Sequence, residues 1–197
     1  MNKLFAIFCL WAAIGVPAAA QDAPSGNLPA DFYPRATCVK PDLTKLDRFD
    51  DMEVLRYNRM IKAYNACGKD YVANAGNDAE RVLAMINAQV ALVNGEAPPV
   101  MPSGASNLPA GFYPASICVR PDKTEIGTMP SSQIVPMNAP GKPNPEGQAV
   151  MDAMAAYNAR VTRYNLQAAA FGACSKDYIA RARIDLAHIE AASYIEQ

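Results

Sequence analysis

The sequence NLPADFYPRATCVKPDLT, at residues 27–44, returns at residues 107–124 as NLPAGFYPASICVRPDKT, with twelve of eighteen positions identical. A second match follows each copy, because residues 57–75 and residues 164–182 share ten of nineteen positions. Each copy therefore consists of a Pro-rich segment with one cysteine and a Tyr-rich segment with another. This duplication predicts two tandem units, and it indicates much less about the molecule on which the protein acts.

The Pro-rich segment of each copy is expected to be an extended arm. Its prolines stand at positions 29, 34 and 41 in the first copy and at 109, 114 and 121 in the second. Proline lacks a backbone N–H and restricts the residue before it, so these segments should avoid helix. The aromatic pair at positions 32–33, and again at 112–113, is expected to pack each arm onto the rest of the chain.

The Tyr-rich segments have the pattern of long amphipathic helices. Aromatic residues recur at intervals of seven, at Tyr57, Tyr64 and Tyr71 and at Tyr157, Tyr164, Phe171 and Tyr178. Apolar residues between them complete one face, which predicts two helices packed side by side as in a coiled coil. The first helix is expected to run to about residue 94 without breaking at Gly76. The second should begin near Asn144 and Pro145.

The predicted fold is all-α, with two tandem repeats. Each repeat is a Pro-rich extended arm linked by a disulfide to a long amphipathic helix, and the two helices pack side by side. Residues 1–20 are assigned to a signal peptide, 21–96 to the first repeat, 97–106 to a Pro-rich linker and 107–197 to the second repeat. The second repeat contains a Pro-rich insertion near residues 127–147, which is expected to be an exposed, poorly ordered loop.

Residues 1–20 have the pattern of an export signal. Lys3 gives a positive start, residues 4–16 are uncharged and largely apolar, and three alanines before Gln21 offer a cleavage site. The competing interpretation is an uncleaved membrane anchor. Residues 4–20 are at the lower limit of length for a span, however, and contain Pro17. The pattern therefore predicts a periplasmic or secreted protein, with no transmembrane segment after cleavage.

Four cysteines remain outside the signal segment, and an even number in an exported protein predicts disulfides. A duplicated unit that was viable alone would carry its own bridge. We therefore expect Cys38–Cys67 and Cys118–Cys174. The main alternative joins equivalent cysteines of the two copies.

Asparagine follows tyrosine at four helical positions, which makes these pairs the candidate site. They are Tyr57, Asn58, Tyr64, Asn65, Tyr157, Asn158, Tyr164 and Asn165. Such aromatic rows stack ligands in some proteins, but they more often fill a helix–helix seam, as we expect for Tyr64 and Tyr164. The asparagines would then set helix register or partner choice, form a polar binding surface, or be a by-product of duplication.

Composition argues against several classes of function. The formal net charge is −1 and no basic block is present, so nucleic acid is not expected as a partner. The single histidine, His188, is too little for a zinc site, and no metal or other cofactor is predicted. No nucleophile–base, P-loop or dinucleotide motif is present either, so no catalytic residue is assigned.

The sequence favours an exported, non-enzymatic interaction, scaffold or assembly protein of the cell envelope or extracellular space. Its expected partner is another protein or an envelope component, and self-association is compatible with the helical pattern. The alternative is a small carboxylate-based hydrolase acting on glycans. A third interpretation is a binder of a small ligand or metal.

Overall fold

The computed structural model describes residues 25–47, 49–131, 137–139, 142–143 and 145–194. The predicted signal peptide, at residues 1–20, lies outside the described residues. In chain order the elements are the 3-10 helix η1 (Leu43–Lys45), α1 (Asp51–Asn94), the 3-10 helix η2 (Lys123–Ile126), β1 (Met137–Ala139), β2 (Lys142–Pro143) and α2 (Pro145–Ser193).

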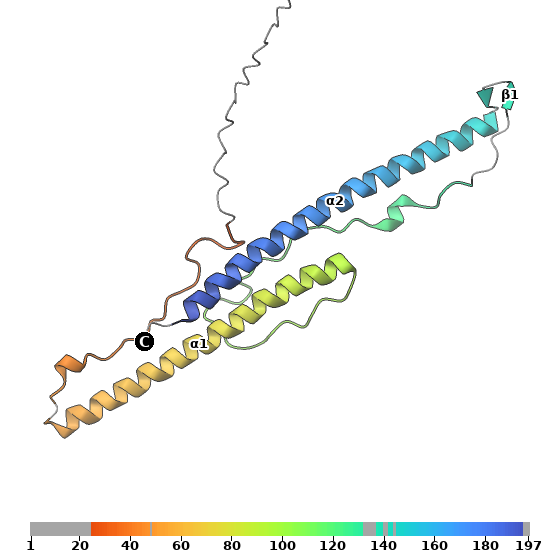
Figure 1. Ribbon diagram of the computed structural model, residues 1–197. Coiled ribbons are helices and arrows are strands. Elements are labelled where there is room, and N and C mark those ends of the chain that lie inside the picture. The colour runs from red at the N-terminus through yellow and green to blue at the C-terminus, as the bar shows by residue number, and fades with distance from the viewer. Residues whose placement is uncertain (1–24, 48, 132–136, 140–141, 144, 195–197) are drawn as a thin grey trace, which may run out of the picture.

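The architecture is dominated by two long helices, α1 of 44 residues and α2 of 49 residues. They run in opposite directions and pack together, as Figure 1 shows. The prediction of two long helices that pack against one another is confirmed. Within the predicted loop of the second copy, β1 and β2 form a small antiparallel pair in which Met137 lies opposite Pro143.

The limits of α1 follow from its terminal residues. The Asp50 side chain accepts hydrogen bonds from the backbone N–H groups of Met52 and Glu53, which otherwise have no partner in the first turn. Gly95 ends the helix in the left-handed conformation, with φ 77°, which glycine adopts without steric cost. The helix is continuous through Gly76, where open space surrounds the position that a side chain would take.

The helices pack through their C-terminal halves only. The buried residues of α1 begin at Tyr71, and after Gly147 those of α2 begin at Phe171. The N-terminal halves project beyond the packed region in opposite directions (Figure 1). Tyr33 and Tyr113, from the segments before the helices, complete the hydrophobic core. The core is therefore short compared with the length of the molecule.

Two disulfides attach the Pro-rich segments to the helices. Cys38 is bonded to Cys67 of α1, and Cys118 is bonded to Cys174 of α2. This is the pairing that the duplication predicts. Neither residues 25–42 nor residues 97–122 contain a helix or strand, so the bridges supply a fixed connection that regular backbone hydrogen bonds do not.

No helix in the described ranges combines the length and the apolarity that crossing a bilayer requires.

Removal of each disulfide by paired cysteine-to-alanine substitution is expected to reduce the free energy of unfolding. Loop-closure entropy predicts a loss of about 3.5 kcal/mol without Cys38–Cys67 and about 4 kcal/mol without Cys118–Cys174, because the second bridge closes the longer loop. Urea denaturation of the two double variants measures both losses. Peptide mapping of the unreduced parent protein is the control, and a Cys67 peptide linked to Cys174 would contradict the pairing.

Candidate functional site

Two buried aspartates stand at aligned positions of the two copies. Asp78 lies on α1 and Asp185 on α2, 107 residues apart, which is the spacing that relates residues 57–75 to residues 164–182. Asp78 is 0% exposed and Asp185 is 1% exposed. Burial of a carboxylate is costly unless hydrogen-bond donors surround it, so each must be paired within the fold.

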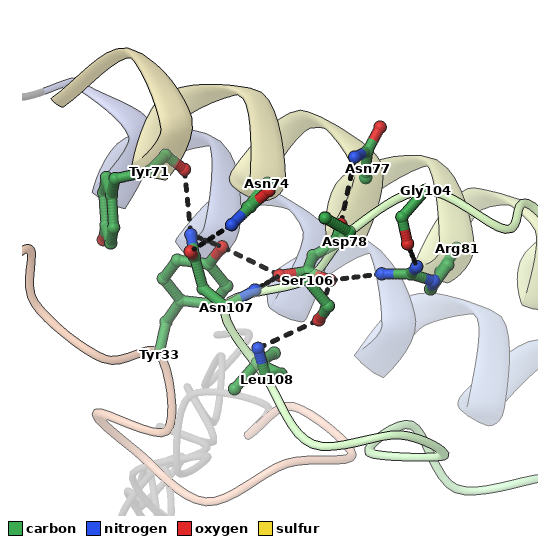
Figure 2. Close-up of polar contacts among 11 residues, drawn as sticks. Tyr33, Tyr71, Asn74, Asn77, Asp78, Arg81, Gly104, Ser106, Asn107 and Leu108 are labelled. Carbon is green, nitrogen blue, oxygen red and sulfur yellow. Dashed lines mark hydrogen bonds and ion pairs between the residues drawn. The ribbon is translucent and has the colours of Figure 1, made fainter. Parts of the chain in front are cut away.

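Four groups donate to the Asp78 carboxylate (Figure 2). The Tyr33 hydroxyl and the backbone N–H of Asn107 each donate to Oδ2 over 3.0 Å. The Arg81 guanidinium donates to Oδ1 over 2.7 Å, and the Ser106 hydroxyl donates to the same oxygen. Both carboxylate oxygens are thus occupied by groups that come from three separate parts of the chain.

The side chain of Asn107 extends this network. Its Nδ2 donates to the Tyr33 hydroxyl and to the backbone carbonyl of Tyr71, each over 2.9 Å. Its Oδ1 accepts a bond from Asn74 Nδ2 over 3.2 Å. Asn107, at the start of the second copy, is therefore bound to the helix of the first copy, as Figure 2 shows.

A matching network surrounds Asp185. The backbone N–H of Asn27 and the Tyr113 hydroxyl both donate to Oδ2 over 2.8 Å, and the Leu28 N–H donates to Oδ1 over 3.4 Å. The Asn27 Nδ2 donates to the Tyr113 hydroxyl and to the Tyr178 carbonyl, over 2.9 and 3.1 Å. Asn27, at the start of the first copy, is bound to the helix of the second.

Each Pro-rich segment therefore begins in contact with the helix of the other copy. Asn27 contacts α2, although Cys38, eleven residues later in the same segment, is bonded to α1. Asn107 contacts α1, although Cys118 is bonded to α2. Each segment therefore joins both helices, and the two networks connect the first copy to the second.

The side-chain donors to the two carboxylates differ at two aligned positions. Arg81 and Ser106 of the Asp78 network correspond to His188 and Gly26 in the other copy. Gly26 packs so closely on Asp185 that an added Cβ would overlap the carboxylate. Among the described residues, the donors to Asp185 are all uncharged, whereas Asp78 also has a guanidinium partner.

Burial raises the pKa of the Tyr33 and Tyr113 phenols far above their ordinary value. The hydrogen bond that each phenol donates to its aspartate raises the pKa further, and the bond accepted from asparagine lowers it. Burial also raises the pKa of Tyr71 and of Tyr178. These four phenols remain neutral donors over the physiological pH range.

The chemistry available to the two carboxylates is limited by their surroundings. Both are buried, and their oxygens are already occupied by protein donors, so neither has a free face for a substrate. Within the described ranges, no group of three or more His, Cys, Asp or Glu side chains could hold a metal ion. The geometry indicates that the two aspartates hold the starts of the Pro-rich segments against the helices.

The sequence-derived candidates lie away from these networks. Tyr57, Tyr64, Tyr157 and Tyr164 are half-buried, and Asn58, Asn65, Asn158 and Asn165 are exposed. Tyr64 and Asn65 line an open groove on α1, and Arg160 stacks over the Tyr157 ring at 5.9 Å. The helical aromatics that are fully buried within the described chain are Tyr71, Phe171 and Tyr178.

Sequence reasoning missed both aspartates and both asparagines of the networks. A signal was present, because an acidic residue recurs at the aligned positions 78 and 185 on an otherwise apolar helix face. The motif NLPA at the start of each copy was a second signal, since an asparagine before Leu-Pro recurs there. The sequence pattern does not show that each asparagine binds the helix of the other copy.

Comparison with known proteins gives no match, whether to a family, to a curated protein or to a solved structure.

Asn27→Ala and Asn107→Ala are each expected to reduce the free energy of unfolding by about 2 kcal/mol. Each change removes the donor to a buried tyrosine hydroxyl, and it also removes the second donor to a helix carbonyl that keeps its bond within the helix. The matched control is Asn165→Ala, at an exposed helical position, where alanine should be neutral or slightly stabilising. Urea denaturation measures all three, and equal effects at Asn107 and Asn165 would contradict the network.

Stability is expected to fall as pH rises above about 10, the ordinary tyrosine pKa. Above that pH the unfolded chain loses phenolic protons that the folded chain retains, so the unfolded state is favoured. Below it, the stabilising contribution is complete.

Each buried phenol should contribute a slope of about 1.4 kcal/mol per pH unit. Urea midpoints between pH 8 and 11 measure the total slope. Tyr113→Phe should reduce it by one such contribution. A slope unchanged in Tyr113→Phe would show that this phenol ionises equally in both states.

Proposed function

We propose that this is an exported, non-enzymatic interaction, scaffold or assembly protein of the cell envelope or extracellular space. The observation that carries the proposal is the exposure of large apolar side chains on elements held in fixed positions. Phe49 is 99% exposed directly before α1, and Ile117 is 90% exposed beside the bonded Cys118. Where such side chains gather into one surface, that surface typically marks a contact with a partner.

The projecting half of α1 extends the apolar surface that begins at Phe49. Met52, Leu55 and Met60 are exposed on its first turns. The Asp50 cap and the Cys38–Cys67 bridge hold this region in place. Because the backbone that carries these side chains is already helical, a partner would bind them at a lower cost in backbone conformational entropy.

Export is part of the same proposal. Two disulfides are consistent with an oxidising periplasmic or extracellular location. The signal peptide at residues 1–20, with cleavage before Gln21, would deliver the chain there.

We also propose that the two copies are structural repeats, each a Pro-rich arm and a helix. The matched bridges and the matched Asp78 and Asp185 networks support this assignment. The paired helices would then serve as one rigid support for surfaces at both ends.

Site-specific photocrosslinking in the native host tests the interaction role. A photoreactive phenylalanine analogue is placed at Phe49 or Ile117, with Glu80, an exposed residue elsewhere on α1, as the control position. The expected result is a covalent adduct with one envelope or extracellular component from Phe49 or Ile117 and not from Glu80. Absence of a specific adduct from both apolar positions, in a protein exported at normal level, would overturn the proposal.

A further inference from the structure

When aligned positions are compared, the buried core positions begin seven residues later on α1 than on α2. The buried core positions of α2 begin at Phe171 and Ser175, which are 8% and 1% exposed. Their counterparts on α1, at an offset of 107, are Tyr64 and Gly68, and both are only half-buried. Among the described residues, the same kind of surface is therefore covered in the second copy and open in the first.

A residue near the end of α1 contacts Ser175. The last residue of α2, Ser193, aligns with Ile86, yet α1 continues to Asn94. Within this additional stretch, the buried Gln89 donates from Nε2 to the Ser175 hydroxyl over 2.7 Å. The final two turns of α1 thus lie over the region of Ser175 on α2. The equivalent region of α1, around Gly68, lies past the residue at which α2 ends.

An arginine contacts the C-terminal end of α1. Arg120, of the second Pro-rich segment, donates from Nη1 to the carbonyl of Leu92 over 3.3 Å. This carbonyl is in the last turn of α1, where the backbone carries partial negative charge. The residue aligned with Arg120 is Lys40, and Lys40 lines the open groove. The groove therefore has a positive residue at the place where the other copy binds a helix C-terminus.

The open groove is lined by apolar side chains together with two lysines. Ile61, Tyr64, Gly68 and Val72 form its floor, and Val72 is 42% exposed. Lys40 and Lys69 also line it, with Ser193 and Tyr194 of the α2 end. Gly68 stands where the other copy has Ser175, so the floor has room for a close helix backbone.

We propose that this groove, formed by Ile61, Tyr64, Gly68 and Val72, binds the C-terminal turns of an amphipathic helix from a partner protein. The partner helix would present small apolar residues to the floor and its terminal carbonyls to Lys40. The other half of the molecule shows the arrangement, with α1 residues 87–94 in the place of the partner. This inference rests on the proposed interaction function and names one surface and one class of partner for it.

The probe is a synthetic peptide with the sequence of residues 82–96, VLAMINAQVALVNGE, with a fluorophore attached to its N-terminal amine. It reproduces the segment that covers the equivalent surface in the second copy. Fluorescence anisotropy with the full mature chain is expected to show saturable one-to-one binding. Because this assay needs no native partner, absence of binding would overturn the groove proposal alone and leave the photocrosslinking result intact, so the two failures can be distinguished.

Two matched variants identify the binding surface. Val72→Glu places a charge on the groove floor, and Leu83→Glu makes the same change at a similarly exposed residue of α1 outside the groove. Peptide affinity should fall at least tenfold in Val72→Glu and remain within twofold in Leu83→Glu. Both variants should retain the parental melting temperature, since neither position is buried.

Three other outcomes would also overturn the proposal. Binding that persists in Val72→Glu would mean that the peptide displaces the end of α1. Binding seen only after deletion of residues 195–197 would assign the groove to the chain's own terminal segment. A dimer in light scattering that Val72→Glu abolishes would assign it to a second copy of this chain.

Discussion

The structure depends on the requirement that two buried carboxylates be supplied with hydrogen-bond donors. Asp78 and Asp185 lie within the helix pair, where an unpaired carboxylate would cost several kcal/mol. Helix backbone cannot supply those donors, because its own N–H groups are already bonded. They come from Tyr33 and Asn107 at one aspartate and from Tyr113 and Asn27 at the other. The positions of both Pro-rich segments follow from that need.

Local pattern was sufficient to predict the long helices and the cysteine pairing. Seven-residue recurrence of aromatics needs only the residues within one helix, and Cys38–Cys67 follows from comparing one copy with the other. The networks were beyond such reasoning, because Asn27 and Asp185 are 158 residues apart in sequence. Nothing local distinguishes an asparagine that binds its own helix from one that crosses to the other. Tyr33 and Tyr113 were expected to pack, but the role of their hydroxyls depends on that crossing.

Differences between the copies explain where the molecule departs from a symmetric arrangement. Ser106 and Arg81 give Asp78 two donors whose counterparts, Gly26 and His188, give Asp185 none. The backbone near Gly26 approaches Asp185 instead, which requires the absence of a side chain there. Gly68 aligns with Ser175 and lines the open groove. Among the described residues, no equivalent of Gln89 contacts it. Each replacement matches a changed contact, so these substitutions are coupled to the packing around them.

The contact of each Pro-rich segment with the helix of the other copy also determines which parts of the molecule are connected. The Asp78 network includes Asn107 from the second copy, and the Asp185 network includes Asn27 from the first, so each aspartate takes part of its donors from the other copy. The two networks therefore connect the copies where α1 and α2 pack together. The projecting halves have no such reciprocal contact among the described residues. There, Arg160 of α2 donates to the backbone carbonyl of Ile126, which ties the projecting half of α2 to the segment before it. Reciprocal contacts between the copies are concentrated at the centre, and exposed apolar side chains such as Phe49 lie toward an end.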